Sequence, residues 1–206
     1  MSEEAAAAPM HFMPPLPAEE AARANFYALL ARLFYAPPDE PLLRTLASSG
    51  DLDVDEGAMG SAWQGLVRAA TSGDPEAIRD EYDTVFVGTG KSPVTLYACA
   101  YSMRTTNDVP LVDLKADLAS LGLARSQSAS EPEDHIAALC EVMRYIVTER
   151  PKDLEAQSRF FSRWVWPTVQ PLCGAIEASP ATGFYKSVSN LFREFCTLEH
   201  AAFEML

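Results

Sequence analysis

The stretch Ser130-Glu131-Pro132-Glu133-Asp134-His135 is a polar segment that leads directly into an apolar helical pattern. Behind it, apolar residues recur at spacings of three and four, the period of a helix with one buried face. Pro132 suits the first turn of a helix, and the acids around it suit the positive end of the helix dipole. We therefore expect Asp134 and His135 on the first turn of a long helix. Its buried stripe is expected to comprise Ile136, Leu139, Cys140, Met143, Ile146 and Val147.

The same helical period runs through most of the remaining chain. No segment alternates apolar and polar residues as a half-buried strand would. Pro37-Pro38, Gly73 and Gly122 mark helix ends, and Pro167 and Pro171 are expected to bend or restart a helix. The pattern predicts an all-α fold, a single elongated helical domain of roughly eight to eleven helices. The residues expected to face its core include Ala22, Phe26, Leu29, Leu30, Leu33, Leu46, Trp63, Leu66, Ile78, Tyr82, Leu114, Leu118, Val188, Leu191, Phe192, Phe195 and Leu198.

Two regions interrupt the helical pattern. Residues 1–17 are rich in alanine and proline, and they lack both the positive charge and the apolar run of a signal peptide. We expect a flexible arm there, followed by one all-helical domain over residues 18–206. Within that domain, residues 125–130 form a polar, serine-rich link across which the two halves are expected to be able to exchange between chains.

The bulk composition restricts the partners and the cellular compartment. The chain has 206 residues, with 16 basic and 29 acidic side chains and a net charge of −13. Such a charge disfavours nucleic acid and anionic lipid surfaces. The four cysteines form neither a Cys-x-x-Cys pair nor a zinc-binding spacing, which favours reduced thiols in the cytoplasm. No run of 18 apolar residues exists, so we expect no stable membrane insertion.

Catalytic motifs fail when they are tested residue by residue. The segment Gly88–Ser92 ends like a phosphate-binding loop, but position 85, where that motif needs glycine, is Val85. His135 and Cys140 are five residues apart, about 140° around a helix, so they cannot form a local nucleophile–base pair. No other constellation suggests catalysis. We therefore predict that the chain is not an enzyme.

A second unusual stretch lies between Gly88 and Ser102. Its glycines and proline interrupt helix, while Leu96, Tyr97 and Tyr101 are too apolar for a plain solvent loop. Such a loop packs back on the body or receives a ligand.

Read together, the two stretches resemble the TorD/DmsD family of molybdoenzyme-assembly chaperones, also called redox-enzyme maturation proteins. The family pattern combines an aromatic–glycine loop, aromatic residues after a proline, and an E-P-x-D-H helix start. This chain has Phe86-Val87-Gly88, then Pro93, and a complete match at residues 131–135.

The resemblance implies a cytoplasmic, cofactor-free chaperone that binds the twin-arginine leader of a molybdopterin-containing oxidoreductase subunit and delays its export until its cofactor is inserted. It also leaves open contacts with molybdenum-cofactor biosynthesis proteins. Two alternatives remain open. One is a nitrate-reductase-type chaperone for a molybdoenzyme that is not exported, and the other is a nucleotide-binding or hydrolytic helical protein. A chaperone of the family that the chain resembles is expected to bind GTP weakly at most. Carboxylates such as Glu131 and Asp134 suit arginine, and a neutral His135 suits peptide backbone. The predicted peptide-binding residues are Phe86, Gly88, Pro93, Leu96, Tyr97, Tyr101, Glu131, Pro132, Asp134 and His135.

Overall fold

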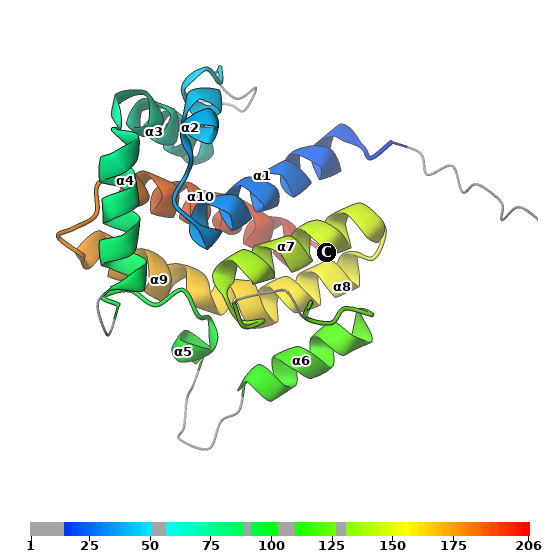
Figure 1. Cartoon of the computed structure of the whole chain (residues 1–206). Coiled ribbons are helices and arrows are strands. Elements are labelled where there is room, and N and C mark those ends of the chain that lie inside the picture. Colours follow the sequence, from blue (N-terminus) through cyan, green and yellow to red (C-terminus); the bar gives the residue numbers. More distant parts are fainter. Residues whose placement is uncertain (1–14, 51–56, 89–91, 103–109, 127–130) are drawn as a thin grey trace, which may run out of the picture.

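The computed structural model describes residues 15–50, 57–88, 92–102, 110–126 and 131–206. Within these ranges the chain forms ten α-helices and two π-helical turns, with no named strand (Figure 1), so the all-α prediction is confirmed. Residues 1–14 of the predicted arm and residues 127–130 of the predicted link lie outside them. The elements are α1 Ala18–Tyr35, α2 Glu40–Ala47, α3 Ala58–Ser72, α4 Pro75–Tyr82, η1 Asp83–Val87, α5 Cys99–Ser102, α6 Pro110–Ser120, α7 Ile136–Glu149, α8 Leu154–Phe160, η2 Phe161–Val165, α9 Trp166–Ala178 and α10 Phe184–Glu204.

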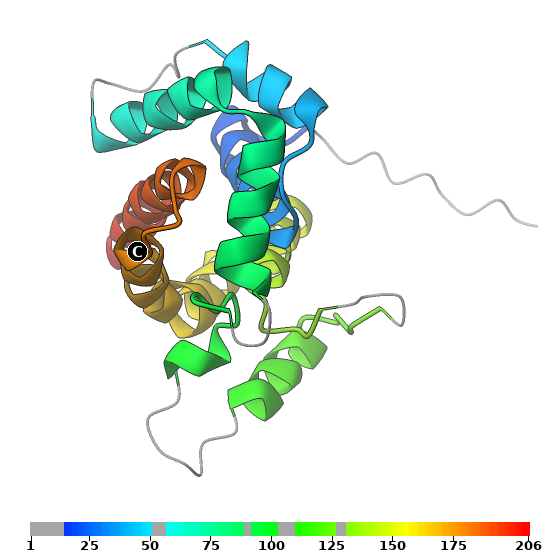
Figure 2. The same cartoon turned by 60° about the vertical axis from the view of Figure 1, so that its left-hand side comes forward.

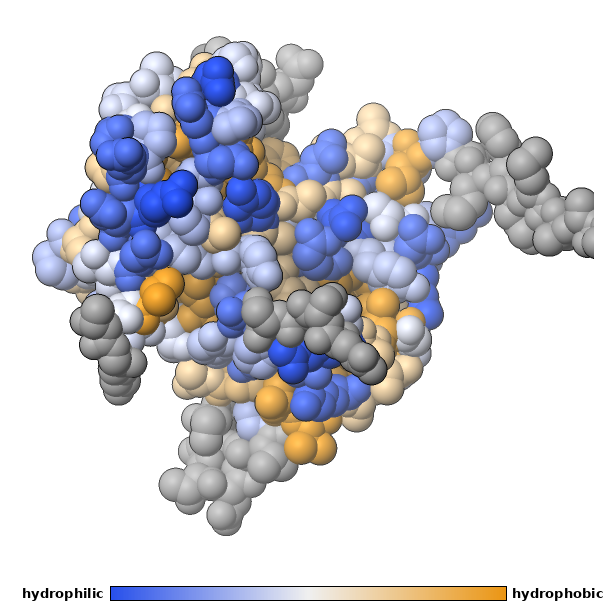
Figure 3. Space-filling model, viewed as in Figure 1, coloured by the Kyte–Doolittle hydropathy of each residue, from blue (hydrophilic) through white to orange (hydrophobic). Residues whose placement is uncertain are grey.

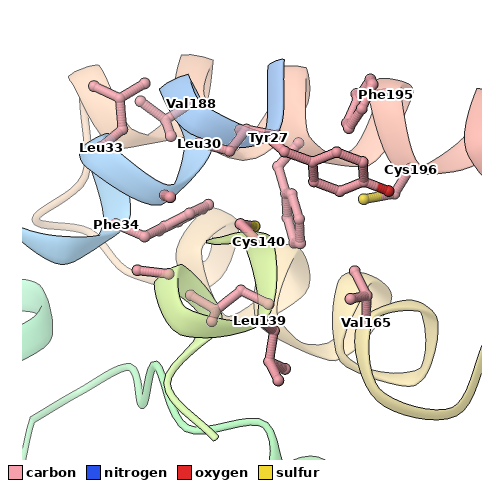
Figure 4. Packing of buried hydrophobic residues seen from close by; sticks show 14 of the residues in the cluster. Tyr27, Leu30, Leu33, Phe34, Leu139, Cys140, Val165, Val188, Phe195 and Cys196 are labelled. Carbon is pink, nitrogen blue, oxygen red and sulfur yellow. The ribbon is translucent and has the colours of Figure 1, made fainter. Parts of the chain in front are cut away.

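The centre of the fold is the pair α1 and α7, which pack along each other, while α10 packs on α3 and α9 (Figure 1). Figure 4 shows side chains of α1, α7, η2 and α10 directed into one shared core. The predicted stripe of α7 is confirmed, because all six of its residues are fully buried. The predicted face of α1 is partly wrong. Ala22 is exposed, and the helix buries Tyr27 and Phe34 because it lies between α7 and α10.

A buried ion pair fixes α1 to α10. Arg23 donates through Nε and Nη2 to the two carboxylate oxygens of Glu199, at 2.7 and 2.8 Å, and the Tyr27 hydroxyl donates to Glu199 at 2.7 Å. Burial of this carboxylate is acceptable because its oxygens are paired. The contact sets the register of α1, and therefore the places where its outer residues reach the surface.

Pro167 explains the irregular turn between α8 and α9. Proline has no N–H, so the carbonyl four residues earlier loses its helical partner. The helix widens immediately before it into η2, where the Trp166 N–H donates to the Phe161 carbonyl. The predicted disturbance at Pro167 is confirmed, whereas Pro171 lies inside α9 without interrupting it. Among the described helices, none is long and apolar enough to span a membrane.

Candidate functional site

The two stretches singled out in the sequence lie side by side in the structure. The Leu96 carbonyl accepts from the Ile136 N–H at 2.8 Å, and the Asp134 carbonyl accepts from the Ala98 N–H at 2.8 Å. Between these bonds, Tyr97 and His135 form an isolated antiparallel bridge. The aromatic loop is therefore fastened to the start of α7 through the backbone.

The start of α7 differs from the sequence-based prediction. The helix begins at Ile136, so Pro132 and Asp134 precede it and His135 is its N-cap. The His135 Nδ1 atom accepts the Ala137 N–H at 3.2 Å, which places the proton of the neutral ring on Nε2. A separate turn precedes the helix, in which the His135 N–H donates to the Pro132 carbonyl at 3.2 Å.

The ring of His135 is buried and neutral. Burial lowers its pKa below 6.5, and it outweighs the opposing effect of the nearby carboxylates of Glu131 and Asp134. The ring meets Tyr97 and Tyr35 edge to face, with centroids 5.5 and 6.5 Å away. The prediction of a neutral histidine is supported, with burial as its main cause.

Tyr97 and Glu131 form the exposed edge of the site. The Tyr97 hydroxyl donates to a Glu131 carboxylate oxygen at 2.8 Å. This hydrogen bond, more than burial, raises the pKa of Tyr97 to about 12. Within the described ranges this is the one side-chain hydrogen bond of Glu131, and it occupies one of the two carboxylate oxygens.

Beside this edge lies an open groove of about 600 Å³. Its floor is the outer face of α7, and its walls come from α1 and from the end of α6 with the chain that follows. The groove is open and mainly apolar, and small or partly buried apolar side chains line it. Its apolar lining comprises Ala31, Tyr35, Leu118, Leu123, Ala124, Pro132, Ala137, Ala138, Val142 and Tyr145.

Charged side chains border the groove, three acidic and three basic. Glu133 has a side chain only 13% exposed and contacts the Lys115 ammonium at 3.7 Å. Glu141 pairs with Arg144 at 2.7 Å on the surface of α7. The lining also includes Glu131, Arg32, Arg125, Ser126 and His135.

The predicted site residues separate into two groups. Glu131, Pro132 and His135 line the groove, while Tyr97 adjoins it through Glu131. Leu96 and Asp134 lie behind it, both buried. Asp134 accepts the Cys99 N–H with a carboxylate oxygen, 3.3 Å away, and it does not line the groove. This position differs from the one expected of a residue that contacts the peptide. Burial, with a contribution from Asp134, raises the pKa of the Cys99 thiol to about 12.

The remaining predicted residues shape the loop. Phe86 packs against the rings of Tyr82 and Tyr185 in the core. Gly88 has φ of 62°, a left-handed conformation that suits glycine, where the chain leaves η1. The Tyr101 hydroxyl donates to the Thr95 carbonyl at 2.8 Å. Pro93 is exposed, and it does not line the groove.

Sequence reasoning missed the apolar groove residues of α7. Ala138, Val142 and Tyr145 recur at spacings of four and three on the face opposite the core stripe. A second, weaker apolar stripe on one helix was the available signal. Tyr35, which is 53% exposed at the end of α1, carries no local signal of this kind.

No group of three or more histidine, cysteine or acidic side chains within the described ranges is arranged to hold a metal ion. The same part of the chain shows its four cysteines as free thiols, three of them buried.

Comparisons with known proteins agree with this geometry. The sequence model of the family described as "Nitrate reductase delta subunit" matches residues 53–173. The chaperone protein YcdY of Escherichia coli (strain K12) is 26% identical over 180 residues, 82% of this chain and 91% of YcdY. The chaperone protein TorD of Vibrio atlanticus (strain LGP32) is 29% identical over 170 residues, 75% of this chain and 77% of TorD.

A solved structure shows the same fold. A redox enzyme maturation protein from Archaeoglobus fulgidus superposes with a TM-score of 0.55 at 18% identity, covering 92% of this chain and 98% of that one. The resemblance noted at residues 131–135 is thereby confirmed. The chain belongs to the nitrate reductase delta subunit family, the TorD-like chaperones of redox enzyme maturation.

Proposed function

We propose that this chaperone binds, in the cytoplasm, the twin-arginine leader of a molybdopterin-containing oxidoreductase subunit and retains it until cofactor insertion is complete. The observation that carries the proposal is the apolar groove along α7, with Glu131 and Glu133 at the end where the helix begins. A leader of this kind has two arginines followed by an apolar stretch, and the groove offers a matching sequence of surfaces.

The arginines suit the carboxylates because those carboxylates hold weak or exchangeable partners. Glu133 contacts Lys115 at 3.7 Å, a single long contact that a planar guanidinium can replace with two short ones. Among the described residues, Glu131 accepts only the Tyr97 hydroxyl. Within that part of the chain, the ion pair that an incoming arginine displaces at this end of the groove is the 3.7 Å contact of Lys115 with Glu133.

The apolar stretch suits the rest of the groove. From His135 to Tyr145 the helix rises on the order of 15 Å, which is the length of about ten residues of a leader helix. The neutral His135 places a donor beside the groove without repelling arginine. Partly exposed side chains such as Val142 and Tyr145 lose further water contact when the leader covers them.

The test is calorimetric titration with a synthetic twin-arginine leader peptide and with the same peptide carrying lysine in place of both arginines. We expect Glu131→Gln and Glu133→Gln each to weaken the arginine peptide by roughly 1–2 kcal/mol, because each removes a charge-assisted bond. Glu149→Gln, an exposed acid farther along α7 and outside the groove, is the control. Equal binding of both peptides by every variant would contradict the proposal.

A second candidate function is favoured by the matched family's description. In that case the partner is a molybdoenzyme that is not exported and whose leader lacks the arginine pair. Tight binding of such a leader, insensitive to Glu131→Gln and Glu133→Gln, would select it. We propose no cofactor for either function, and calorimetry with GTP and ATP, expected to show at most weak binding, tests this.

A further inference from the structure

One wall of the groove depends on where α6 lies. Leu118, on the last turn of α6, and Leu123, just after it, line the groove opposite α1 and α7. Both views of the chain show α6 at the outer edge of the molecule, away from the central helices (Figures 1 and 2). Contacts that fix α6 therefore also fix the width of the groove.

Apolar contacts attach α6 to the body without fixing its orientation. Leu114, Leu118 and Leu121 are buried beneath the helix. Its opposite side is open, and Val112 there is 61% exposed. Figure 3 shows hydrophobic and hydrophilic residues mixed over this lower part of the molecule. Because the hydrophobic effect is not directional, these contacts resist detachment far more than they resist a small rotation or slide.

The directional contacts of α6 converge on Asp117, the residue before Leu118. Its two carboxylate oxygens accept from Nη1 of Arg163 at 3.2 and 2.9 Å. One of them also accepts from Nε1 of Trp164 at 2.8 Å. The Arg163 guanidinium lies over the Trp164 ring, 4.9 Å from its centroid, and reaches Asp113 at 3.3 Å.

The π-helical turn presents these two partners together. Arg163 and Trp164 are adjacent residues in η2, the segment widened by Pro167. Trp164 is buried, with 5% of its surface exposed, so the core holds its ring in place. The ring N–H that donates to Asp117 therefore has a fixed position. Short π-helical turns frequently occur at functional sites.

The other polar attachments of α6 cannot replace this one. Lys115 contacts Glu133, the same carboxylate that an incoming arginine takes in the proposed function. Arg150 donates to the Leu121 carbonyl at 3.0 Å, beyond the last residue of the helix. With a leader bound, the side-chain contacts that hold α6 within the described ranges are those to η2. Asp117 makes the shorter ones, to Arg163 and Trp164, and Asp113 adds one contact to Arg163 at 3.3 Å.

We propose that Asp117, held by Arg163 and Trp164, is a positioning residue that sets the groove width and thereby selects the size of the apolar side chains accepted from a leader. The inference rests on the proposed function and deepens it, because it assigns specificity to a contact outside the groove. Asp117 itself does not touch the peptide.

The experiment measures selectivity rather than affinity alone. Three synthetic twin-arginine peptides differ only in the apolar stretch, which carries leucines, phenylalanines or alanines at two positions. We expect the wild type to prefer the leucine peptide over the phenylalanine peptide roughly tenfold, since overpacking a fixed groove is costly. We expect Asp117→Ala to reduce this preference below about threefold, with a melting temperature within a few degrees of the wild type.

Two further variants grade the effect. Asp117→Asn keeps an acceptor for Trp164 and loses the charge, so it should retain an intermediate preference. Asp80→Asn, an exposed acid on α4, is the control and should retain the full preference. An unchanged preference in Asp117→Ala, or no preference in the wild type, would overturn the inference.

A readout without peptide separates this inference from the proposed function. Amide hydrogen exchange of α6 in the free protein should quicken in Asp117→Ala and stay unchanged in Asp80→Asn. If the wild type bound none of the peptides, the proposed function would fail. Faster exchange in Asp117→Ala would then still support the positioning role, and unchanged exchange would overturn it.

Discussion

The first turns of α7 and α10 begin in contrasting ways. At α10, the Glu81 carboxylate of α4 accepts the N–H groups of Gly183, Phe184 and Tyr185 at 2.9, 3.0 and 2.8 Å. At α7, the side-chain cap among the described residues is the His135 ring, which accepts one bond from the Ala137 N–H. The helix dipole favours an anion at such a position, so α10 has the better cap and α7 the poorer one.

The difference indicates what each helix start is for. At α10 the cap is Glu81, 102 positions before Gly183 in the chain, so it stabilises the packing of α4 against the start of α10. At α7 the acids Glu131 and Glu133 are directed to the groove instead of to the helix amides. We infer that the start of α7 is less well capped because its polar side chains, Glu131, Glu133 and His135, line the groove.

The largest effect on stability is expected at the start of α10, the better capped of the two helices. Glu81→Ala removes three charge-assisted bonds and leaves the first turn of α10 without a side-chain cap, so the free energy of unfolding should fall by about 2–3 kcal/mol. Urea denaturation measures this, with Asp80→Ala as the neighbouring control. Leader affinity should be unchanged in Glu81→Ala, and a parallel loss of binding would break the distinction between the two helix starts.

Asp134 should give a smaller change of the same kind. Asp134→Asn weakens the bond to the Cys99 N–H behind the groove, so we expect a loss of about 1 kcal/mol in unfolding free energy. Since the side chain does not line the groove, binding should decline much less than in Glu131→Gln. If Asp134→Asn weakened the leader as strongly as Glu131→Gln does, Asp134 would have to turn into the groove when the leader binds.

His135 should give the smallest effect and a specific pH dependence. Its folded pKa lies below 6.5, so the unfolded chain takes up the proton first as the pH falls. The resulting stability is complete above the unfolded pKa, and it is lost progressively from about pH 6.5 down to the folded value. His135→Asn keeps a capping acceptor without this titration.

The measurement is urea denaturation of wild type and His135→Asn between pH 5 and 8. The difference in unfolding free energy between the two proteins should shift against the wild type as the pH falls. A difference that stays constant across the range would show that the ring is not held neutral by burial. Leader binding to the folded wild type should weaken only as the pH approaches the folded pKa of His135, because the folded ring becomes a cation that repels arginine only there.

Local periodicity was sufficient wherever one helix face simply meets the core. The buried stripe of α7 and the end of α6 near Gly122, which has φ of 77°, followed from spacing and residue type. The same reasoning misplaced Leu198, which is 52% exposed on α10. Periodicity identifies an apolar face, but it does not say how far along a helix the neighbouring elements continue to cover that face.

The sequence by itself determined the helical class, most of the core and the family, because these depend on spacings within one helix or on a contiguous motif. Only the tertiary structure decided the site. It turned Asp134 to the Cys99 amide, placed His135 as the cap of α7, and brought Tyr35 and Leu118 to the same groove from residues 83 positions apart. The physical reason is that a groove exists only between packed helices, and its lining depends on their register and rotation, which no single segment encodes.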